Sequence, residues 1–189
     1  ALKAYLCARD ARCLCANVAA EALPIAPCAV KTMGNGLRVG IVGIVTDWVN
    51  RWEKPANLEG IRVTEPLEAA RAALESMRGK VDFTIGIYHG GYEKDLQTGR
   101  LLSDTDENIA CRICEELDFD LLLTGHQHLK LENAVWHGTH LAQTPANGTH
   151  FIRVDVHENG AIESSLHPAI ITDTPGFEKE EAEVNAWLD

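Results

Sequence analysis

The sequence predicts an α/β domain in which buried strands alternate with helices. Three apolar runs of strand length are separated by two stretches with helical periodicity, and the connections are short. This alternation is typical of layered α/β folds. The chain has 189 residues, which is enough for one domain with its own core.

The first strong strand is predicted at residues 37–45, a run rich in Val, Ile and Gly. The sequence 33–36, Met-Gly-Asn-Gly, predicts a hairpin turn, because Asn-Gly favours the positive φ angles that tight turns need. This turn would join residues 28–31 to the strand. Three earlier elements are expected: the end of a helix at 1–11, a short strand at 12–17 and a proline-containing connection at 21–27.

A helix is predicted over residues 64–78. Pro66 stands near its start, where the missing backbone N–H of proline costs nothing. The preceding stretch 46–60 is predicted to be a polar loop. It carries Trp48 and Trp52, for which packing of the loop is favoured over the binding of a base, with a role near a substrate cleft as the open alternative.

Two further buried strands flank a second predicted helix. The strands are expected at 81–88 and 119–124, and the helix at 104–117. Residues 103–107 offer hydroxyl and carboxylate oxygens of the kind that cap a helix N-terminus. Asn108 is likewise interpreted as a helix cap rather than a ligand.

After His128 the pattern changes to short strands, which predicts an antiparallel β section. The sequence 158–160, Glu-Asn-Gly, predicts a hairpin turn within it. Residues 172–189 are acidic, with a weak helical pattern. The expected strands are 132–136, 139–144, 151–156 and 161–167.

Composition excludes some partners. The formal charge of −11 argues against binding a nucleic-acid polymer, whose phosphates would be repelled. No apolar run approaches the roughly 18–20 residues that a membrane-spanning helix needs.

Six cysteines are present, and most are predicted to be small buried apolar residues, with disulfides as the alternative. Cys111 and Cys114 fall inside a helical pattern rather than at a helix start, which disfavours a redox motif. This usage favours a reducing, cytoplasmic compartment.

Histidines follow two of the predicted strands directly. His89 comes after the strand 81–88, and His126 and His128 follow the strand 119–124. Ligands of layered α/β domains bind beyond the carboxyl ends of the strands, and imidazole is a common ligand of transition metals. If the strands are neighbours, the three rings share one edge and predict a metal site. The alternative is a set of loop histidines on a His-rich chain.

The histidine segments resemble known metal-binding motifs. His89-Gly90-Gly91-Tyr92-Glu93 and Gly125-His126-Gln127-His128 resemble the last two metal-binding motifs of calcineurin-like metallophosphoesterases. The resemblance extends from about Ala1 to about Thr174. It is strongest to the 5′-nucleotidase family and, within it, to the bifunctional 2′,3′-cyclic-nucleotide 2′-phosphodiesterase/3′-nucleotidase branch. The other segments that carry it are 14–18, 39–43, 52–55, 107–110 and 147–151.

The resemblance implies part of a layered metallophosphoesterase β-sandwich flanked by helices. Residues 1–171 would form the C-terminal half of the catalytic domain, and residues 172–189 the start of a linker to an absent C-terminal domain. The family's Asp-x-His, Gly-Asp and Gly-Asn-His-Glu motifs do not occur here. The catalytic residues are therefore expected in an absent N-terminal half, and this chain alone is expected to be inactive.

The resemblance also implies a reaction. His89 and His126 would bind one divalent metal ion and His128 a second, the metals being Zn, Mn, Fe or Co. A metal-activated water would then hydrolyse a nucleotide or a 2′,3′-cyclic nucleotide. Members of this family are usually periplasmic or on the cell surface, whereas the cysteine usage favours a cytoplasmic location.

Several neighbouring residues have open roles. His150 could bind a ligand or substrate phosphate, although a structural role is favoured. Asn108, Tyr92 and Glu93 could orient the metal ligands through hydrogen bonds without binding the metal themselves. A second class of function stays open, namely a non-catalytic α/β module whose histidines bind one metal weakly or none.

Overall fold

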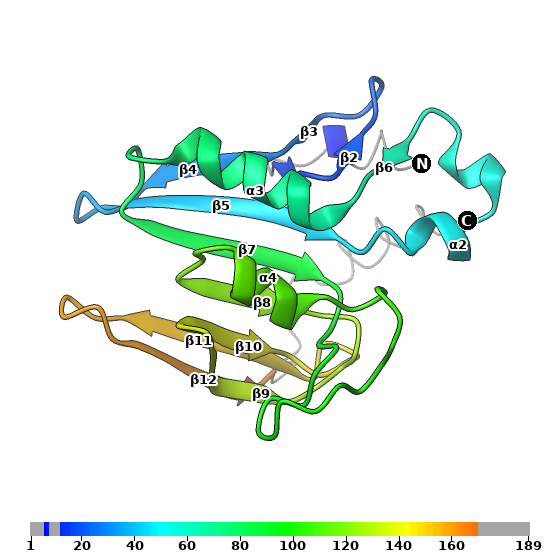
Figure 1. Cartoon of the computed structure of the whole chain (residues 1–189). Coiled ribbons are helices and arrows are strands. Elements are labelled where there is room, and N and C mark those ends of the chain that lie inside the picture. The colour runs from blue at the N-terminus through cyan, green and yellow to red at the C-terminus, as the bar shows by residue number, and fades with distance from the viewer. Residues whose placement is uncertain (1–5, 8–11, 170–189) are drawn as a thin grey trace, which may run out of the picture.

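A six-stranded mixed sheet forms the centre of the fold in a computed structural model, which describes residues 6–7 and 12–169. Its strand order is β4-β5-β7-β8-β10-β9 (Figure 1). The predicted helix at 1–11 lies almost entirely outside the described residues, and the predicted linker at 172–189 lies wholly outside them. The six strands are β4 (Cys28–Thr32), β5 (Arg38–Val45), β7 (Phe83–His89), β8 (Leu121–Thr124), β10 (Thr139–Gln143) and β9 (Leu131–Trp136).

The pairing of these strands confirms the predicted α/β architecture. β4 and β5 form the antiparallel hairpin expected from the Asn-Gly turn. β5, β7, β8 and β10 run parallel, whereas β9 is antiparallel to β10. The section after His128 was expected to be antiparallel, and this is wrong for β10, which extends the parallel part of the sheet. The carboxyl ends of β5, β7 and β8 thus meet at one edge.

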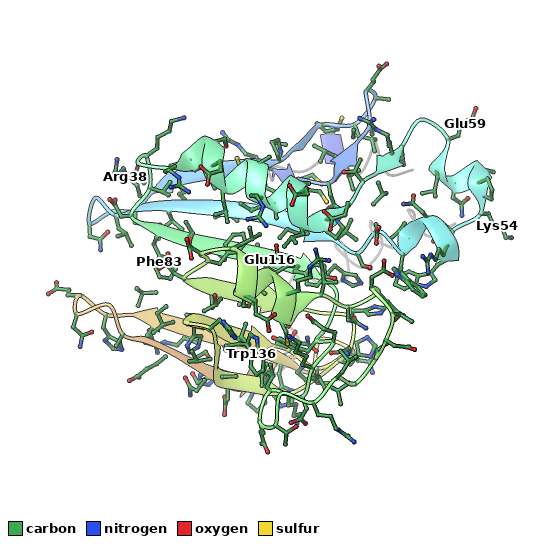
Figure 2. The ribbon with its side chains drawn as sticks, viewed as in Figure 1. Arg38, Lys54, Glu59, Phe83, Glu116 and Trp136 are labelled. Carbon is green, nitrogen blue, oxygen red and sulfur yellow. The ribbon has the colours of Figure 1, made fainter. Side chains whose placement is uncertain are left out.

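Two helices cover one face of the sheet, α3 (Pro66–Met77) and α4 (Ala110–Glu116) (Figure 1). Apolar side chains from both helices pack with strand residues such as Val42 and Leu122, which are fully buried. Burial of this apolar surface is the main stabilising contribution to the layer. Trp136 of β9, labelled in Figure 2, also donates a hydrogen bond to Glu115 near the end of α4 (3.1 Å).

The other face of the sheet is covered only in part. The hairpin of β11 (His150–Val156) and β12 (Ile162–Pro168) packs against Val39, Phe83 and Leu121. Nearer the carboxyl ends of the strands, Ile87 lies on the same face as Phe83, because side chains alternate along a strand, and it is 47% exposed. Ile87 is therefore an exposed apolar residue on this face, although the main chain of Leu14 lies close to Gly43 of the neighbouring strand β5.

The second predicted helix begins later than expected. It was predicted over 104–117, whereas α4 starts only at Ala110. The cap comes from a distant loop: the Glu93 carboxylate accepts hydrogen bonds from the backbone N–H groups of Cys111 (3.0 Å) and Arg112 (2.7 Å). The local oxygens of 103–107 are thus not used as caps.

The stretch 46–60 is not a simple loop. It contains the short helix α2 (Val49–Trp52) and a 3₁₀ turn, η1 (Pro55–Leu58). Four two-residue strands form two small peripheral pairs, with β1 parallel to β3 and β2 antiparallel to β6. They are β1 (Cys13–Leu14), β2 (Val18–Ala19), β3 (Ile25–Ala26) and β6 (Arg62–Val63).

Cysteine burial follows the prediction only for Cys111 and Cys114, which are buried in α4. Burial raises the pKa of both thiols to about 12, so both stay protonated and unreactive at neutral pH. Cys13, Cys15 and Cys28 are half-buried and Cys7 is exposed, so most are not fully buried. No helix in the described part of the chain is long and apolar enough to cross a membrane.

Candidate functional site

Two of the predicted histidines meet at the carboxyl edge of the sheet. His89 is the last residue of β7, and His126 lies two residues beyond β8, its parallel neighbour. Their ring centroids are 5.6 Å apart in an edge-to-face arrangement. Both His126 (φ 69°) and His128 (φ 58°) adopt the left-handed backbone conformation. Residues other than glycine rarely adopt this backbone conformation, and when they do, they are often found at functional sites.

Gln127, between the two histidines, joins their turn to the loop after β7. Its Oε1 accepts a hydrogen bond from the Tyr92 backbone N–H (2.8 Å), and its Nε2 donates to the Tyr92 carbonyl (3.1 Å). The side chain passes so close to Gly91 that a Cβ there would overlap it. This close approach explains why the loop after His89 carries a glycine at that position.

The environment of His89 favours its neutral form. Burial lowers the pKa of His89 first, and the nearby His126 and His128 lower it further. A neutral imidazole has the free nitrogen lone pair that a metal ion requires. His126 and His128 therefore lie close enough to His89 to influence its charge.

Glu107 is a member of the site that the sequence did not identify. One of its carboxylate oxygens, Oε1, lies 2.8 Å from Nε2 of His126. The sequence pattern predicted Glu107 to be an acid in the first turn of a helix, and this prediction is wrong because α4 starts three residues later. Its only sequence signal was its place in the segment 107–110, one of those that carry the family resemblance.

Trp52, expected to pack the loop, contacts the site directly. Its indole stacks on the His126 imidazole, with ring centroids 5.1 Å apart and an interplanar angle of 20°. Trp52 remains 46% exposed. Trp48 supports the same segment by donating from Nε1 to an Asp106 carboxylate oxygen (2.8 Å).

The remaining predicted residues are distributed around this centre. Asn108 does not cap α4; its Oδ1 accepts a hydrogen bond from the Gly91 backbone N–H (2.7 Å) and so fixes the loop that follows His89. Tyr92 accepts from the Thr124 hydroxyl (2.8 Å) at the end of β8. Among the described residues, the side chain of His150 hydrogen-bonds only to Thr149 (3.0 Å), and the structure does not bring it into the group.

The donor types at this edge, imidazole and carboxylate, suit a divalent transition metal. Within residues 6–7 and 12–169, however, no three His, Cys, Asp or Glu side chains gather closely enough to hold a metal ion. Metal sites need three or four protein donors as a rule. The described residues therefore provide at most part of a ligand set.

The chain is similar to several known phosphoesterases and nucleotidases. The trifunctional nucleotide phosphoesterase protein YfkN of Bacillus subtilis is 28% identical over 104 residues, which is 54% of this chain and 7% of that protein. A crystal structure of a putative 5′-nucleotidase from Staphylococcus aureus is 24% identical, with a TM-score of 0.79 over 99% of this chain and 39% of its own. The calcineurin-like phosphoesterase YfkN from Bacillus subtilis is 18% identical, with a TM-score of 0.72 over 95% of this chain and 64% of its own. No protein-family profile matches the chain.

These structural matches confirm the fold that the resemblance implied. The chain has the fold of the calcineurin-like phosphoesterase and of the putative 5′-nucleotidase. It spans less than two thirds of the length of each of these relatives.

Proposed function

We propose that this chain forms one wall of a metal-dependent phosphoesterase site that hydrolyses nucleotides or 2′,3′-cyclic nucleotides. The observation that carries the proposal is the meeting of His89 and His126, 5.6 Å apart, at the carboxyl edge of the sheet. The relatives with this fold include proteins named as nucleotide phosphoesterases and 5′-nucleotidases.

His89 and His126 would hold one divalent ion, and His128 would hold a second. Zn, Mn, Fe and Co all accept imidazole donors such as these. When bound, the ions would supply the activation of a water molecule and the neutralisation of phosphoryl charge. The chain's own contribution is to favour the neutral form of His89, to fix the loop after His89 through Gln127, and to orient His126 through Glu107.

The remaining donors and the catalytic acid are proposed to come from a part of the protein that is not included in these 189 residues. In this proposal residues 1–171 are the C-terminal half of the catalytic domain and residues 172–189 lead to another domain. Two observations support it: the partial ligand set and the exposed apolar side chain of Ile87. His89 lies on the same face of β7, so an element that covered Ile87 would also adjoin His89. The isolated chain is accordingly proposed to be inactive.

The test is phosphodiesterase activity of the full-length protein on bis-p-nitrophenyl phosphate with Mn²⁺ or Zn²⁺ present. His126→Ala is expected to lose most of the activity, whereas His157→Ala, an exposed histidine after β11, is expected to keep it. Near-normal turnover in His126→Ala would refute the assignment of the site. Absence of both metal binding and hydrolysis in the unmodified full-length protein would refute the function.

A second candidate is a non-catalytic α/β module whose histidines bind one metal weakly or none. The observation that favours it is the lack of three converging donors within the described ranges. Elemental analysis of the purified full-length protein separates the two, since the first proposal requires close to two metal ions per chain.

A further inference from the structure

The segment that carries Glu107 is held against the site by buried hydroxyl groups. The Thr46 hydroxyl donates to the Glu107 carbonyl oxygen (2.8 Å), and the Tyr88 hydroxyl donates to the same oxygen (3.3 Å). Thr46 and Tyr88 are fully buried. The main chain of Glu107 is thus anchored by two buried hydroxyl groups, which keeps its carboxylate within reach of His126.

Trp52, which contacts the same imidazole, is also linked to Thr46 through the start of α2. The Thr46 oxygen that donates to Glu107 also accepts a hydrogen bond from the Trp48 backbone N–H (3.3 Å), just before α2. α2 ends at Trp52, whose indole lies against the His126 ring. One buried hydroxyl thus ties together the two segments that contact His126.

The contact with Glu107 selects one protonation pattern for His126. A carboxylate oxygen accepts a hydrogen bond, so Nε2 must carry the proton, and in the neutral ring the lone pair is then on Nδ1. Metal-binding histidines generally donate their other ring N–H to a carboxylate or carbonyl oxygen, which fixes both tautomer and direction. Within the described residues the His126 ring has no other hydrogen bond that would compete for Nδ1.

We propose that Glu107 and Trp52 are positioning residues for the His126 ring. Glu107 holds the ring at Nε2 and Trp52 stacks on one face, so that Nδ1 is presented to a divalent metal ion. This inference rests on the proposed function, because it needs His126 to be a ligand. Neither residue binds the ion: Glu107 orients the ring and Trp52 restricts its rotation.

The experiment measures Zn²⁺ affinity of the full-length protein by competition with a chromophoric chelator. Glu107→Ala is expected to weaken binding by about 10–100-fold, the usual effect of removing such a partner. Glu107→Gln should recover much of the loss, because the amide oxygen still accepts from Nε2–H. Trp52→Ala should weaken binding less than Glu107→Ala, and Trp52→Phe should restore it. Glu163→Gln, an exposed carboxylate on β12, is the matched control and should have no effect.

A second readout is independent of metal binding. ¹⁵N shifts of the histidine rings in the metal-free protein should show His126 protonated at Nε2, and Glu107→Ala should shift the ring towards a mixture of tautomers. Equal losses in Glu107→Gln and Glu107→Ala would show that Glu107 is itself a ligand and would overturn the inference. So would unchanged affinity in Glu107→Ala. If the unmodified protein binds no metal, the proposed function itself has failed, which is a distinct result.

Discussion

Gln127 and Tyr92 connect the two histidine-bearing loops through a reciprocal pair of hydrogen bonds. The Tyr92 backbone N–H donates to Gln127 Oε1 (2.8 Å), and Gln127 Nε2 donates to the Tyr92 carbonyl (3.1 Å). An amide side chain can complete both bonds of such a backbone pair, since it holds a donor and an acceptor side by side. Gln127, which lies between His126 and His128 in the sequence, therefore helps to fix the distance between the loops that carry His89 and His126.

Replacing Gln127 with Leu should separate these loops. The change removes two hydrogen bonds and leaves partly buried backbone groups unpaired, at a cost of about 1–3 kcal/mol in the free energy of unfolding. Metal affinity should fall as well, because the loop that follows His89 loses its anchor. A urea titration and a metal titration of the full-length protein measure the two effects. Gln97→Leu, in an exposed turn, should change neither; equal behaviour of the two variants would contradict this role of Gln127.

His140 provides a pH-dependent contribution to stability away from the site. It is buried in β10, and its Nε2 lies 2.9 Å from the Ser164 hydroxyl oxygen. That oxygen accepts from the Asn133 backbone N–H (2.8 Å), so the Ser164 hydroxyl proton is available to neutral His140. Burial lowers the pKa of His140 below 6.5 in the folded state.

The unfolded chain therefore binds the His140 proton more readily than the folded one. The stabilising contribution is complete above the unfolded pKa of 6.5. It is lost as the pH falls through the lower folded pKa. We expect the urea midpoint of the unmodified protein to fall more steeply below pH 6.5 than that of His140→Gln, and His157→Gln to follow the unmodified protein. Parallel curves for His140→Gln and the unmodified protein would contradict the prediction.

Ile87 tests whether the open face of the sheet is covered in the full-length protein. Its side chain is 47% exposed in the structure, beside His89. If another element covers this face, Ile87→Asp buries an unpaired carboxylate and should cost about 2–4 kcal/mol. Val135→Asp on β9, at a position that is 60% exposed, is the matched control and should be nearly neutral. Equal thermal midpoints for the two variants would indicate that the face stays open to solvent.

Sequence periodicity predicted the parts of the fold that depend on local signals. The Asn-Gly turn between β4 and β5 and the helix α3 were predicted because turn chemistry and the 3.6-residue period are visible in the sequence. Pairing between distant strands is not a local property, and so the parallel pairing of β10 with β8 was missed. The meeting of His89 and His126 was predicted only by assuming that β7 and β8 were neighbours.

The residues that the sequence misplaced in the site are held by long-range contacts. Glu107 looked like a helix-capping acid because Asp, Ser and Thr surround it, yet Glu93 caps α4 from another loop. Trp52 looked like a loop-packing residue, and its stacking on His126 depends on the position of α2 relative to β8. Side-chain contacts of this kind follow from tertiary packing, which no spacing in the sequence encodes.

Thr46 contacts both segments that reach His126, so its alteration should disturb both contacts. Its hydroxyl donates to the Glu107 carbonyl (2.8 Å) and accepts from the Trp48 backbone N–H (3.3 Å). Thr46→Val keeps the shape but removes both bonds, so we expect a loss of about 1–3 kcal/mol in stability. Metal affinity should fall in the same direction as in Glu107→Ala. Thr46→Ser retains the hydroxyl and should restore metal affinity, although the missing methyl group still costs about 1 kcal/mol of packing. Chelator competition and thermal unfolding of the three proteins measure this, and a Thr46→Val protein that is less stable but binds metal normally would show that Thr46 serves the fold alone.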